Sequence, residues 1–323
     1  MAELSPVSAA LFAFQRREQR FVLTRATLAY LALRIVVGAA FFALTWSSWG
    51  AILHWYAEAI RGVSTGGDPT APPLEVFAAV APWAAVSGLL GLVIFAAFEA
   101  ACLRWMVRQE PGGPFGIGFG ADTWRVFAIY WMWFACLLAV TVGVVAFYLA
   151  LRTLAGLHQV LQVAAMLIGA LAPLGLIGVL LWVGVRLSPA AATSVASKKL
   201  TFFGAWGATR GRFWPLLGAF VLVFVGYLVA ATVLDAILRI PFTSALMPAW
   251  EQLIVGGGSP ADFIAKLQEV FSQPTYIAFG VLYIVMITAL ACVFYVAWFG
   301  VNARVVHAAQ AQRAGQAPGA ASA

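Results

Sequence analysis

Apolar residues dominate six long stretches of this chain, and shorter polar segments separate them. A helix needs about 20 predominantly apolar residues to cross the hydrocarbon core of a membrane. Each stretch reaches that length. The pattern therefore predicts an all-α fold, a polytopic membrane helix bundle formed by residues 26–303. Its six transmembrane helices are expected at residues 26–46, 79–103, 125–151, 159–185, 214–238 and 275–300.

The composition agrees with a chain that is solvated by lipid. Hydrophobic residues make up 63% of the sequence and charged residues only 10%, and the mean hydropathy is +0.94. A soluble domain is typically about half apolar and about a quarter charged. The apolar excess argues against a soluble helical protein, because a single core could not bury it.

Basic residues are concentrated in alternate connections. If the N-terminus lies inside, the inside segments hold Arg16, Arg17, Arg20, Arg25, Arg104, Arg108, Arg125, Arg186, Lys198, Lys199, Arg210, Arg212, Arg304 and Arg313, and the outside segments hold only Arg61, Arg152, Arg239 and Lys266. Positive charge is retained on the cytoplasmic side. We therefore expect both termini in the cytoplasm. An excess of Arg over Lys is typical of GC-rich bacteria, which indicates the bacterial inner membrane. The net charge of +7 follows this topology, so no nucleic-acid partner is expected.

The connections also contain amphipathic segments. Residues 1–25 are predicted to include a cytoplasmic amphipathic helix in which Ser5 is the cap and Pro6 occupies the first turn. Such a helix can lie in the headgroup plane with its arginines toward anionic lipid. Residues 260–271 show a similar pattern on the outside. The C-terminal segment 304–323 is rich in Ala, Gln and Gly, which favours a flexible cytoplasmic tail.

The two large cytoplasmic connections resemble each other. Each leaves a span at an arginine and returns through Phe-Gly-Ala, a Trp and an Arg, at Phe119–Arg125 and at Phe203–Arg210. This similarity is either an internal repeat or the general preference of Trp and Arg for the headgroup level. Under both readings we expect contact with lipid headgroups at Trp124, Arg125, Trp206, Arg210 and Arg212.

Two ionisable residues lie within apolar stretches. Arg34 belongs to the first span and Glu99 to the second. A charge inside the bilayer costs a few kcal/mol on insertion scales, so mutual pairing is the economical explanation. We predict an intramembrane Arg34–Glu99 pair that ties span 1 to span 2. A functional role of Glu99, as a proton or headgroup site, is the alternative.

Pro173 lies near the middle of the fourth span, among several glycines. A proline inside a helix removes a backbone hydrogen bond and kinks the helix. The sequence therefore predicts a kink at Pro173. Both a packing kink and a pore or hinge element are compatible with this pattern.

Catalytic and metal-binding patterns do not emerge from the sequence. Cys102, Cys136 and Cys292 fall within predicted spans without CxxC spacing, and the three histidines fall in different connections. Membrane-embedded acyl or phosphoryl chemistry needs a base, a nucleophile or a metal cluster. Glu110 and Asp122 are too few for such a set. We therefore expect no enzyme activity, no cofactor and no bound metal.

Two blocks of sequence carry a resemblance to a known group. The stretch Arg186-Leu187-Ser188-Pro189-Ala190-Ala191, with Ala205-Trp206 and Thr209-Arg210-Gly211-Arg212-Phe213-Trp214, resembles uncharacterised bacterial six-span proteins. Their membrane portion is similar to the domain attached to some glycerophosphodiester phosphodiesterases. The stretch Arg108-Gln109-Glu110-Pro111 resembles a second block. The phosphodiesterase catalytic domain has no counterpart here, so the resemblance implies a membrane module without hydrolase activity.

These observations favour a non-enzymatic membrane scaffold or lipid-interacting module. Its expected partners are membrane lipids, including anionic headgroups, together with a protein partner or a second copy of the chain. The alternative is a small transporter or channel for a lipid-like or apolar solute. A transporter of polar solutes should gather several polar groups within the membrane, and the sequence alone does not reveal such a group.

Overall fold

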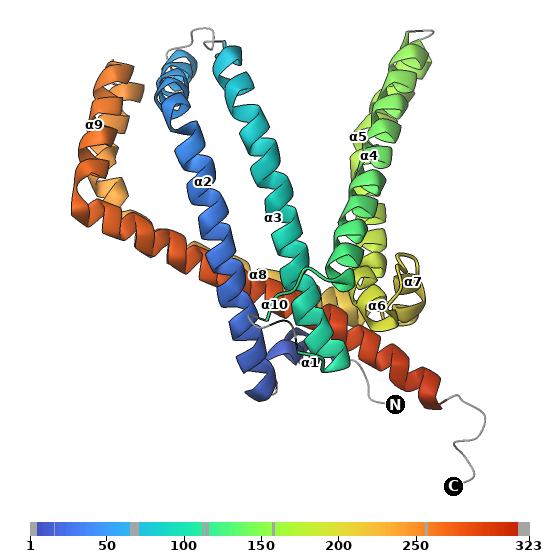
Figure 1. Cartoon of the computed structure of the whole chain (residues 1–323). Helices are drawn as coiled ribbons and strands as arrows, with labels where there is room; N and C mark the ends of the chain where they lie inside the picture. The colour runs from blue at the N-terminus through green and yellow to red at the C-terminus, as the bar shows by residue number, and fades with distance from the viewer. Residues whose placement is uncertain are drawn as a thin grey trace. The chain divides into compact units, whose positions relative to one another are not determined.

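The computed structural model describes residues 5–15, 17–64, 71–111, 113, 116–156, 159–255 and 258–315. Every regular element in these ranges is a helix (Figure 1). In chain order they are α1 (Pro6–Ala10), the short 3₁₀ helix η1 (Phe12–Phe14), α2 (Arg17–Ser64), α3 (Leu74–Arg108), α4 (Ala121–Ala155), α5 (Gln159–Leu187), α6 (Ala190–Ser197), α7 (Gly204–Ala208), α8 (Phe213–Ile254), α9 (Pro260–Ser272) and α10 (Pro274–Gly315).

Six helical segments are long and apolar enough to cross a membrane. They are Phe21–Val63, Leu74–Arg108, Ala121–Ala155, Leu161–Ser197, Phe213–Ile254 and Pro274–Arg313. The predicted all-α fold with six membrane-spanning helices is therefore confirmed. The helices extend well beyond the predicted spans, because helix formation continues into flanking segments that a hydropathy window excludes.

Both ends of the chain differ from their prediction. The amphipathic segment divides into α1, η1 and the start of α2, because Ala9 and Ala13 are buried against the protein. The tail from residue 304 is helical as far as Gly315, because Val305 is fully buried and cannot leave the core. Residues 316–323 lie outside the described residues.

The chain divides into two compact units. Unit 1 contains residues 1–26, 96–223 and 296–323, and unit 2 contains residues 27–95 and 224–295. The boundaries fall inside α2, α3, α8 and α10, so each of these helices contributes to both units.

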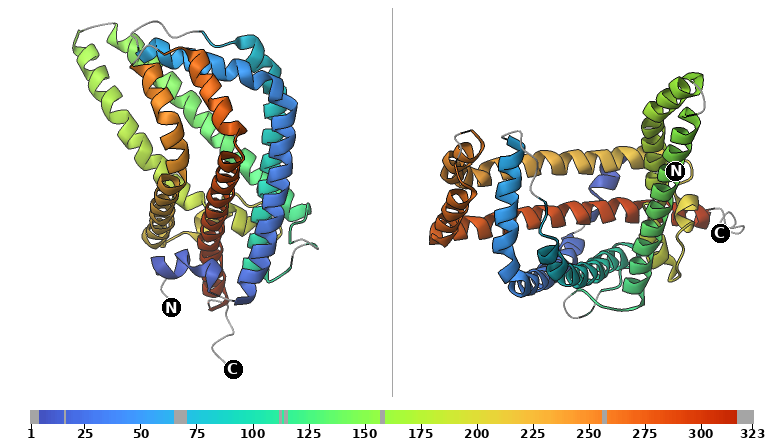
Figure 2. Two further views of the ribbon diagram at one scale, coloured as in Figure 1. Left: turned by 90° about the vertical axis from the view of Figure 1, so that its left-hand side faces the viewer. Right: turned by 90° about the horizontal axis from the view of Figure 1, so that it is seen from above.

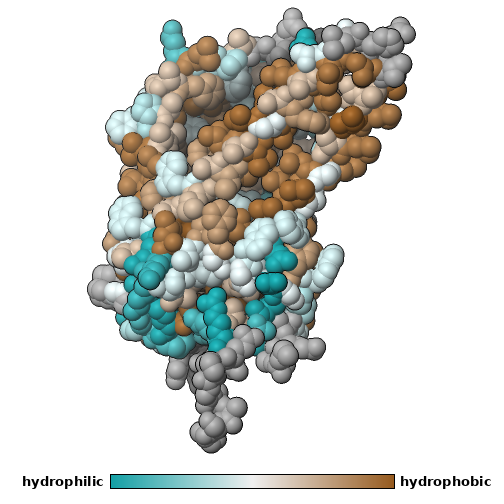
Figure 3. All heavy atoms as spheres, turned by 90° about the vertical axis from the view of Figure 1, so that its right-hand side faces the viewer, coloured by the Kyte–Doolittle hydropathy of each residue, from teal (hydrophilic) through white to brown (hydrophobic). Residues whose placement is uncertain are grey.

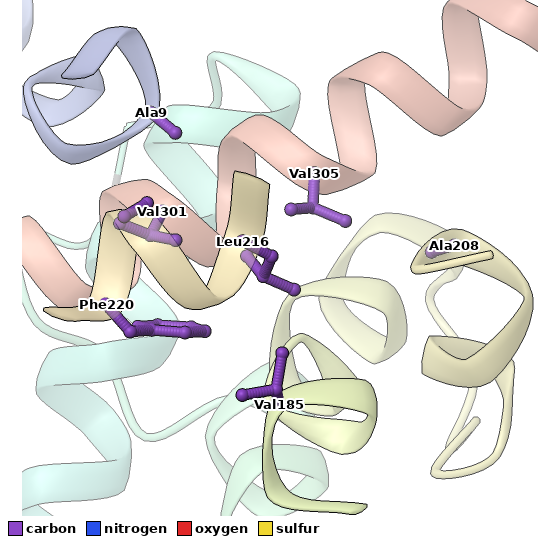
Figure 4. Packing of buried hydrophobic residues seen from close by; sticks show 8 residues of the cluster. Ala9, Val185, Ala208, Leu216, Phe220, Val301 and Val305 are labelled. Atoms are coloured by element: carbon purple, nitrogen blue, oxygen red, sulfur yellow. The ribbon is translucent and has the colours of Figure 1, made fainter. Parts of the chain in front are cut away.

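Unit 1 has a well-packed core of small and branched side chains. Leu216 of α8, Val301 and Val305 of α10 and Ala9 of α1 are all fully buried, and Val185 at the end of α5 packs with them (Figure 4). The N-terminal segment fits closely on α10 (Figure 2), because a Cβ atom at Gly300 would lie only 2.8 Å from the Cβ of Ala13. This core brings the N-terminal segment and the ends of three long helices together.

The hairpin of α4 and α5, also in unit 1, has a different character. The two helices pack side by side, and their exposed side chains are apolar over most of their length. Polar side chains gather at one end of the hairpin, beside α6 and α7 (Figure 3). Such an apolar surface is expected of helices solvated by lipid.

Unit 2 is held largely by aromatic contacts. Trp55 of α2 meets Phe77 of α3 with ring centroids 5.6 Å apart. Helix α9 begins with a capping box between Ser259 and Asp262, and its Phe263 packs on Trp250 of α8. The amphipathic helix predicted at 260–271 is therefore present.

Candidate functional site

A buried ion-pair network joins the end of α3 to the start of α4 in unit 1. Arg108 Nη2 lies 2.5 Å from Asp122 Oδ2, and Arg125 Nη1 lies 2.5 Å from Asp122 Oδ1. Asp122 sits in the first turn of α4, where the helix dipole favours a negative charge. The side chains of Arg108 and Asp122 are 11% and 9% exposed, so little solvent screens the pair. One carboxylate thus serves two arginines.

Further hydrogen bonds fix the connection before α4. Thr123 Oγ1 donates to the carbonyl oxygen of Gly118 at 2.6 Å, which holds the loop against the first turn of the helix. Arg108 Nη1 donates to the carbonyl oxygen of Val195 at 2.9 Å and so links this connection to α6. At the solvent-exposed side of the network, Glu110 pairs with both Arg108 and the exposed Lys198.

The second connection begins with α6, which is buried through Ala190, Ala192 and Val195. Small side chains let this helix approach α4 and α7, with which it packs. Helix α6 ends at Lys198, whose φ of 56° places it in the left-handed conformation typical of a helix C-terminus. Lys199 and Leu200, which follow, are exposed, and Phe202 is buried again.

Arg186 lies at the end of α5 between two tryptophans. Its guanidinium is 5.8 Å from the ring centroid of Trp182 and 5.7 Å from that of Trp206. The two rings meet edge to face. Arg186 Nη1 also donates to the carbonyl oxygen of Thr209 at 3.2 Å, and Thr209 Oγ1 donates back to the carbonyl oxygen of Arg186. Aromatic faces and carbonyls, instead of a carboxylate, surround this charge.

Two more polar side chains join the remaining helix ends. Arg212 donates to the carbonyl oxygen of Ala208 at 2.9 Å and to that of Ala308 on α10 at 3.2 Å. Burial lowers the pKa of the Arg212 guanidinium below its ordinary value. His307 Nε2 lies 2.7 Å from the carbonyl oxygen of Met106 on α3, and it must donate, since a carbonyl only accepts. Together with the bond from Arg108 to α6 and the chain segment 198–203 between α6 and α7, these contacts form a closed circuit through α3, α6, α7 and α10. The bond from Arg186 ties the end of α5 to it.

Residues 198–214 present a basic and aromatic surface outside this circuit. The side chains of Lys198, Lys199 and Arg210 are exposed, and so are large apolar side chains between them. We call this surface the basic-aromatic patch, and its members are Lys198, Lys199, Leu200, Phe203, Trp206, Arg210 and Trp214. Within the described part of the chain, Lys199 and Arg210 form no ion pair with an acidic group.

The residues predicted to contact lipid have different environments. Trp124 is exposed, and Arg210 is exposed within the basic-aromatic patch. Trp206 is 37% exposed while its ring also covers Arg186. Arg125 is paired with Asp122, and Arg212 is engaged with two carbonyls, so both have roles inside the protein.

Glu99 lies in unit 1 and is only 6% exposed. It accepts a hydrogen bond from the hydroxyl of Tyr130 on α4. Arg34 lies in unit 2, where its guanidinium occupies the position that a Cβ atom at Gly91 would take. The Arg34–Glu99 pair therefore stays a prediction. Tyr130 is a partner that the sequence did not indicate.

Pro173 lies within α5, which continues from Gln159 to Leu187. Its side chain is exposed on the α4–α5 hairpin, away from the packed end of unit 1. The kink at Pro173 stays a prediction.

Metal-binding groups do not cluster in the described ranges, where no three His, Cys, Asp or Glu side chains come together. Cys102 and Cys292 are buried free thiols, and Cys136 is an exposed one.

No family model, no curated protein and no solved structure matches this chain. The resemblance to the membrane portion attached to some glycerophosphodiester phosphodiesterases therefore stays a prediction.

Proposed function

We propose that this chain is a non-enzymatic, multi-pass membrane module that binds anionic lipid headgroups through the basic-aromatic patch. The observation that carries the proposal is the exposure of Lys199 and Arg210 in the same short segment as the exposed rings of Phe203 and Trp214. Aromatic rings favour the membrane–water interface, and each basic residue near an anionic surface contributes about 1 kcal/mol. Both kinds of side chain occur within this one segment.

The proposal includes an orientation. Anionic lipid and retained positive charge both belong to the cytoplasmic leaflet of a bacterial inner membrane. The basic-aromatic patch would then face the cytoplasm. Ala9 of the N-terminal segment and Val305 of α10 pack with Val185 and Ala208, which lie next to the patch in the chain, so both termini would be cytoplasmic as well.

The internal polar groups of unit 1 suit a scaffold. Asp122 is saturated by two arginines, and Arg186 and Arg212 are bound to carbonyl oxygens of neighbouring segments. These contacts fix the helix ends that support the patch. A rigid support lowers the entropy cost of holding several headgroups at once.

Lipid retention in nanodiscs tests this function. The protein is reconstituted in a mixture of phosphatidylcholine and phosphatidylglycerol, then released into detergent, and the lipids that remain bound are counted by native mass spectrometry. We expect the variant Lys199→Gln with Arg210→Gln to retain phosphatidylglycerol about fivefold more weakly per charge removed. Equal retention by this variant and the wild type would contradict the proposal.

The matched control removes the same charge elsewhere. Arg152→Gln with Lys266→Gln changes two basic residues of the predicted opposite side, the exposed Arg152 and the half-buried Lys266, which pairs with Glu269. This control should retain phosphatidylglycerol as the wild type does. Loss in both variants would show that net charge, and not the patch, controls retention.

The alternative function, a small transporter or channel for a lipid-like solute, is favoured by Arg34, whose side chain is exposed within a span. Liposomes that contain a lipid with a fluorescent headgroup test it. Chemical bleaching from outside removes only about half of the signal unless the protein moves lipid between leaflets. Complete bleaching would favour transport over a purely structural module.

A further inference from the structure

The position of Arg34 in unit 2 is unusual for a membrane helix. Its side chain is exposed, although α2 is apolar on either side of it. Gly91 of α3 is buried, and any side chain there would overlap Nη1 of Arg34. The guanidinium therefore lies across α3 at Gly91, where the absence of a side chain makes room for it.

Two tyrosines lie close to this point of α3. Arg34 follows Tyr30 by four residues on α2, and Phe95 follows Gly91 by four residues on α3, so each pair shares one face of its helix. Phe95 of α3 packs between the two tyrosines, with ring centroids 6.0 Å from Tyr30 and 4.8 Å from Tyr295. A cation of α2 and the rings of two tyrosines, one from α2 and one from α10, thus lie against neighbouring turns of α3.

The described part of unit 2 gives Arg34 no carboxylate partner. Asp235 is engaged with Arg239 at 2.9 Å and with the hydroxyl of Tyr283 at 2.8 Å. Tyr283 and Tyr295 are twelve residues apart on α10, about 18 Å along the helix at 1.5 Å per residue. Asp235 therefore lies far from the level of Arg34. A cation within the bilayer is expensive, and such residues normally pair or mark a functional site.

We propose that Arg34, Tyr30 and Tyr295 form an intramembrane site for the anionic head of a single amphiphile, a carboxylate or a phosphate. A guanidinium matches either group with two parallel hydrogen bonds. The tyrosine hydroxyls supply further donors, and the rings of Phe95 and its neighbours accommodate the start of an acyl chain. The site belongs to unit 2 and goes beyond headgroup binding by the basic-aromatic patch of unit 1.

Equilibrium binding of a fluorescent fatty acid tests the site. The protein in maltoside detergent is titrated with cis-parinaric acid and, in parallel, with the corresponding uncharged alcohol, and the dissociation constants are compared. The acid should bind about tenfold or more tightly than the alcohol. Arg34→Gln should remove this preference, whereas Arg34→Lys should retain part of it. Equal affinity of the wild type for acid and alcohol would overturn the proposal.

Two competitors separate the sources of the anionic head. Lysophosphatidic acid carries a phosphate and lysophosphatidylcholine is zwitterionic, with similar acyl chains. Displacement of the probe by lysophosphatidic acid alone assigns the site to anionic phospholipid. Failure of both competitors, with retained preference for the acid, assigns it to fatty acid. Displacement that is equal for both competitors and unaffected by Arg34→Gln would contradict an anion site.

Control variants keep the test independent of folding and of the patch. Tyr295→Phe removes one donor hydroxyl and keeps the ring that packs on Phe95, so it should weaken binding of the acid severalfold without affecting binding of the alcohol. This variant decides the question if Arg34→Gln does not fold. The variant Lys199→Gln with Arg210→Gln should bind cis-parinaric acid as the wild type does, which distinguishes this site from the basic-aromatic patch.

Discussion

The two connections that leave α3 and α5 have similar sequences but hold their arginines differently. In the first connection, Arg108 forms an ion pair with Asp122, which lies in the first turn of α4. In the second connection, Arg186 lies between Trp182 and Trp206 and bonds to a carbonyl oxygen. Both arginines are shielded from solvent at the end of a span. An acid in one connection is replaced by aromatic rings in the other.

The helices after the two Phe-Gly-Ala stretches also differ. The stretch at Gly120 starts α4, which continues for the whole span. The stretch at Gly204 starts only the short helix α7, and Gly211, with a φ of 73°, turns the chain before α8 begins. Left-handed backbone of this kind favours glycine. Similar sequences therefore begin a continuous helix in the first connection, and a short helix followed by a turn in the second.

The largest expected effect comes from removing the shared acid of the first connection. Asp122→Ala leaves Arg108 and Arg125 without their common partner in a buried position. We expect a loss of about 3–5 kcal/mol in the free energy of unfolding, since a broken buried pair leaves an uncompensated charge. Unfolding in mixed micelles with increasing dodecyl sulfate measures it. A loss below about 1 kcal/mol would show that solvent reaches the network.

The second connection should give a smaller, pairwise effect. A double-mutant cycle with Arg186→Met and Trp206→Leu isolates the contact between the guanidinium and the ring. The expected coupling is about 1–2 kcal/mol, the range of desolvated cation–π contacts. The same unfolding assay applies. Additive losses would mean that the hydrogen bond to Thr209, and not the ring, secures Arg186.

The hydrogen bond from Tyr130 of α4 to Glu99 of α3 lies farther inside the spans than the two connections do. Tyr130→Phe should cost about 1–3 kcal/mol, because it leaves a buried acceptor without its donor. A cycle of Tyr130→Phe with Glu99→Gln should show coupling of similar size. A parallel cycle of Arg34→Gln with Glu99→Gln measures the predicted intramembrane pair. Strong coupling in this second cycle alone would show that Arg34, and not Tyr130, is the main partner of Glu99.

The smallest effect is expected for the exposed pair that bridges the two connections. Lys198→Gln should change stability by less than about 1 kcal/mol, because the side chains of Lys198 and Glu110 are 62% and 45% exposed. Any loss should disappear when unfolding is repeated in 0.5 M salt. A large loss that persists in salt would place this pair among the buried contacts.

Hydropathy was sufficient to predict the six spans, the amphipathic helix α9 and the concentration of Trp and Arg near the ends of spans. These features depend on local composition and on the length of an apolar stretch. The sequence window also misjudged the end of α10, since the alanines after Arg304 resemble a flexible tail. Burial of Val305 and the bond from Arg212 to Ala308 keep that segment helical.

The partners within unit 1 could not be predicted because they depend on packing. Arg108 and Asp122 are separated by a glycine-rich connection whose path the residue pattern does not define. Tyr130 and Glu99 meet only because α3 and α4 lie side by side at that level. The one sequence signal was the acid in the first turn of α4, where Asp122 is a common helix-start residue with two arginines within reach in the chain.

The closed circuit of contacts in unit 1 connects the ends of several helices. Arg108, Arg186, Arg212 and His307 each bind a carbonyl oxygen of a neighbouring segment, and the last of them returns to α3. If one of these hydrogen bonds breaks, the remaining contacts still connect every helix of the circuit. Lateral separation of these helix ends therefore requires the loss of two of the hydrogen bonds at the same time.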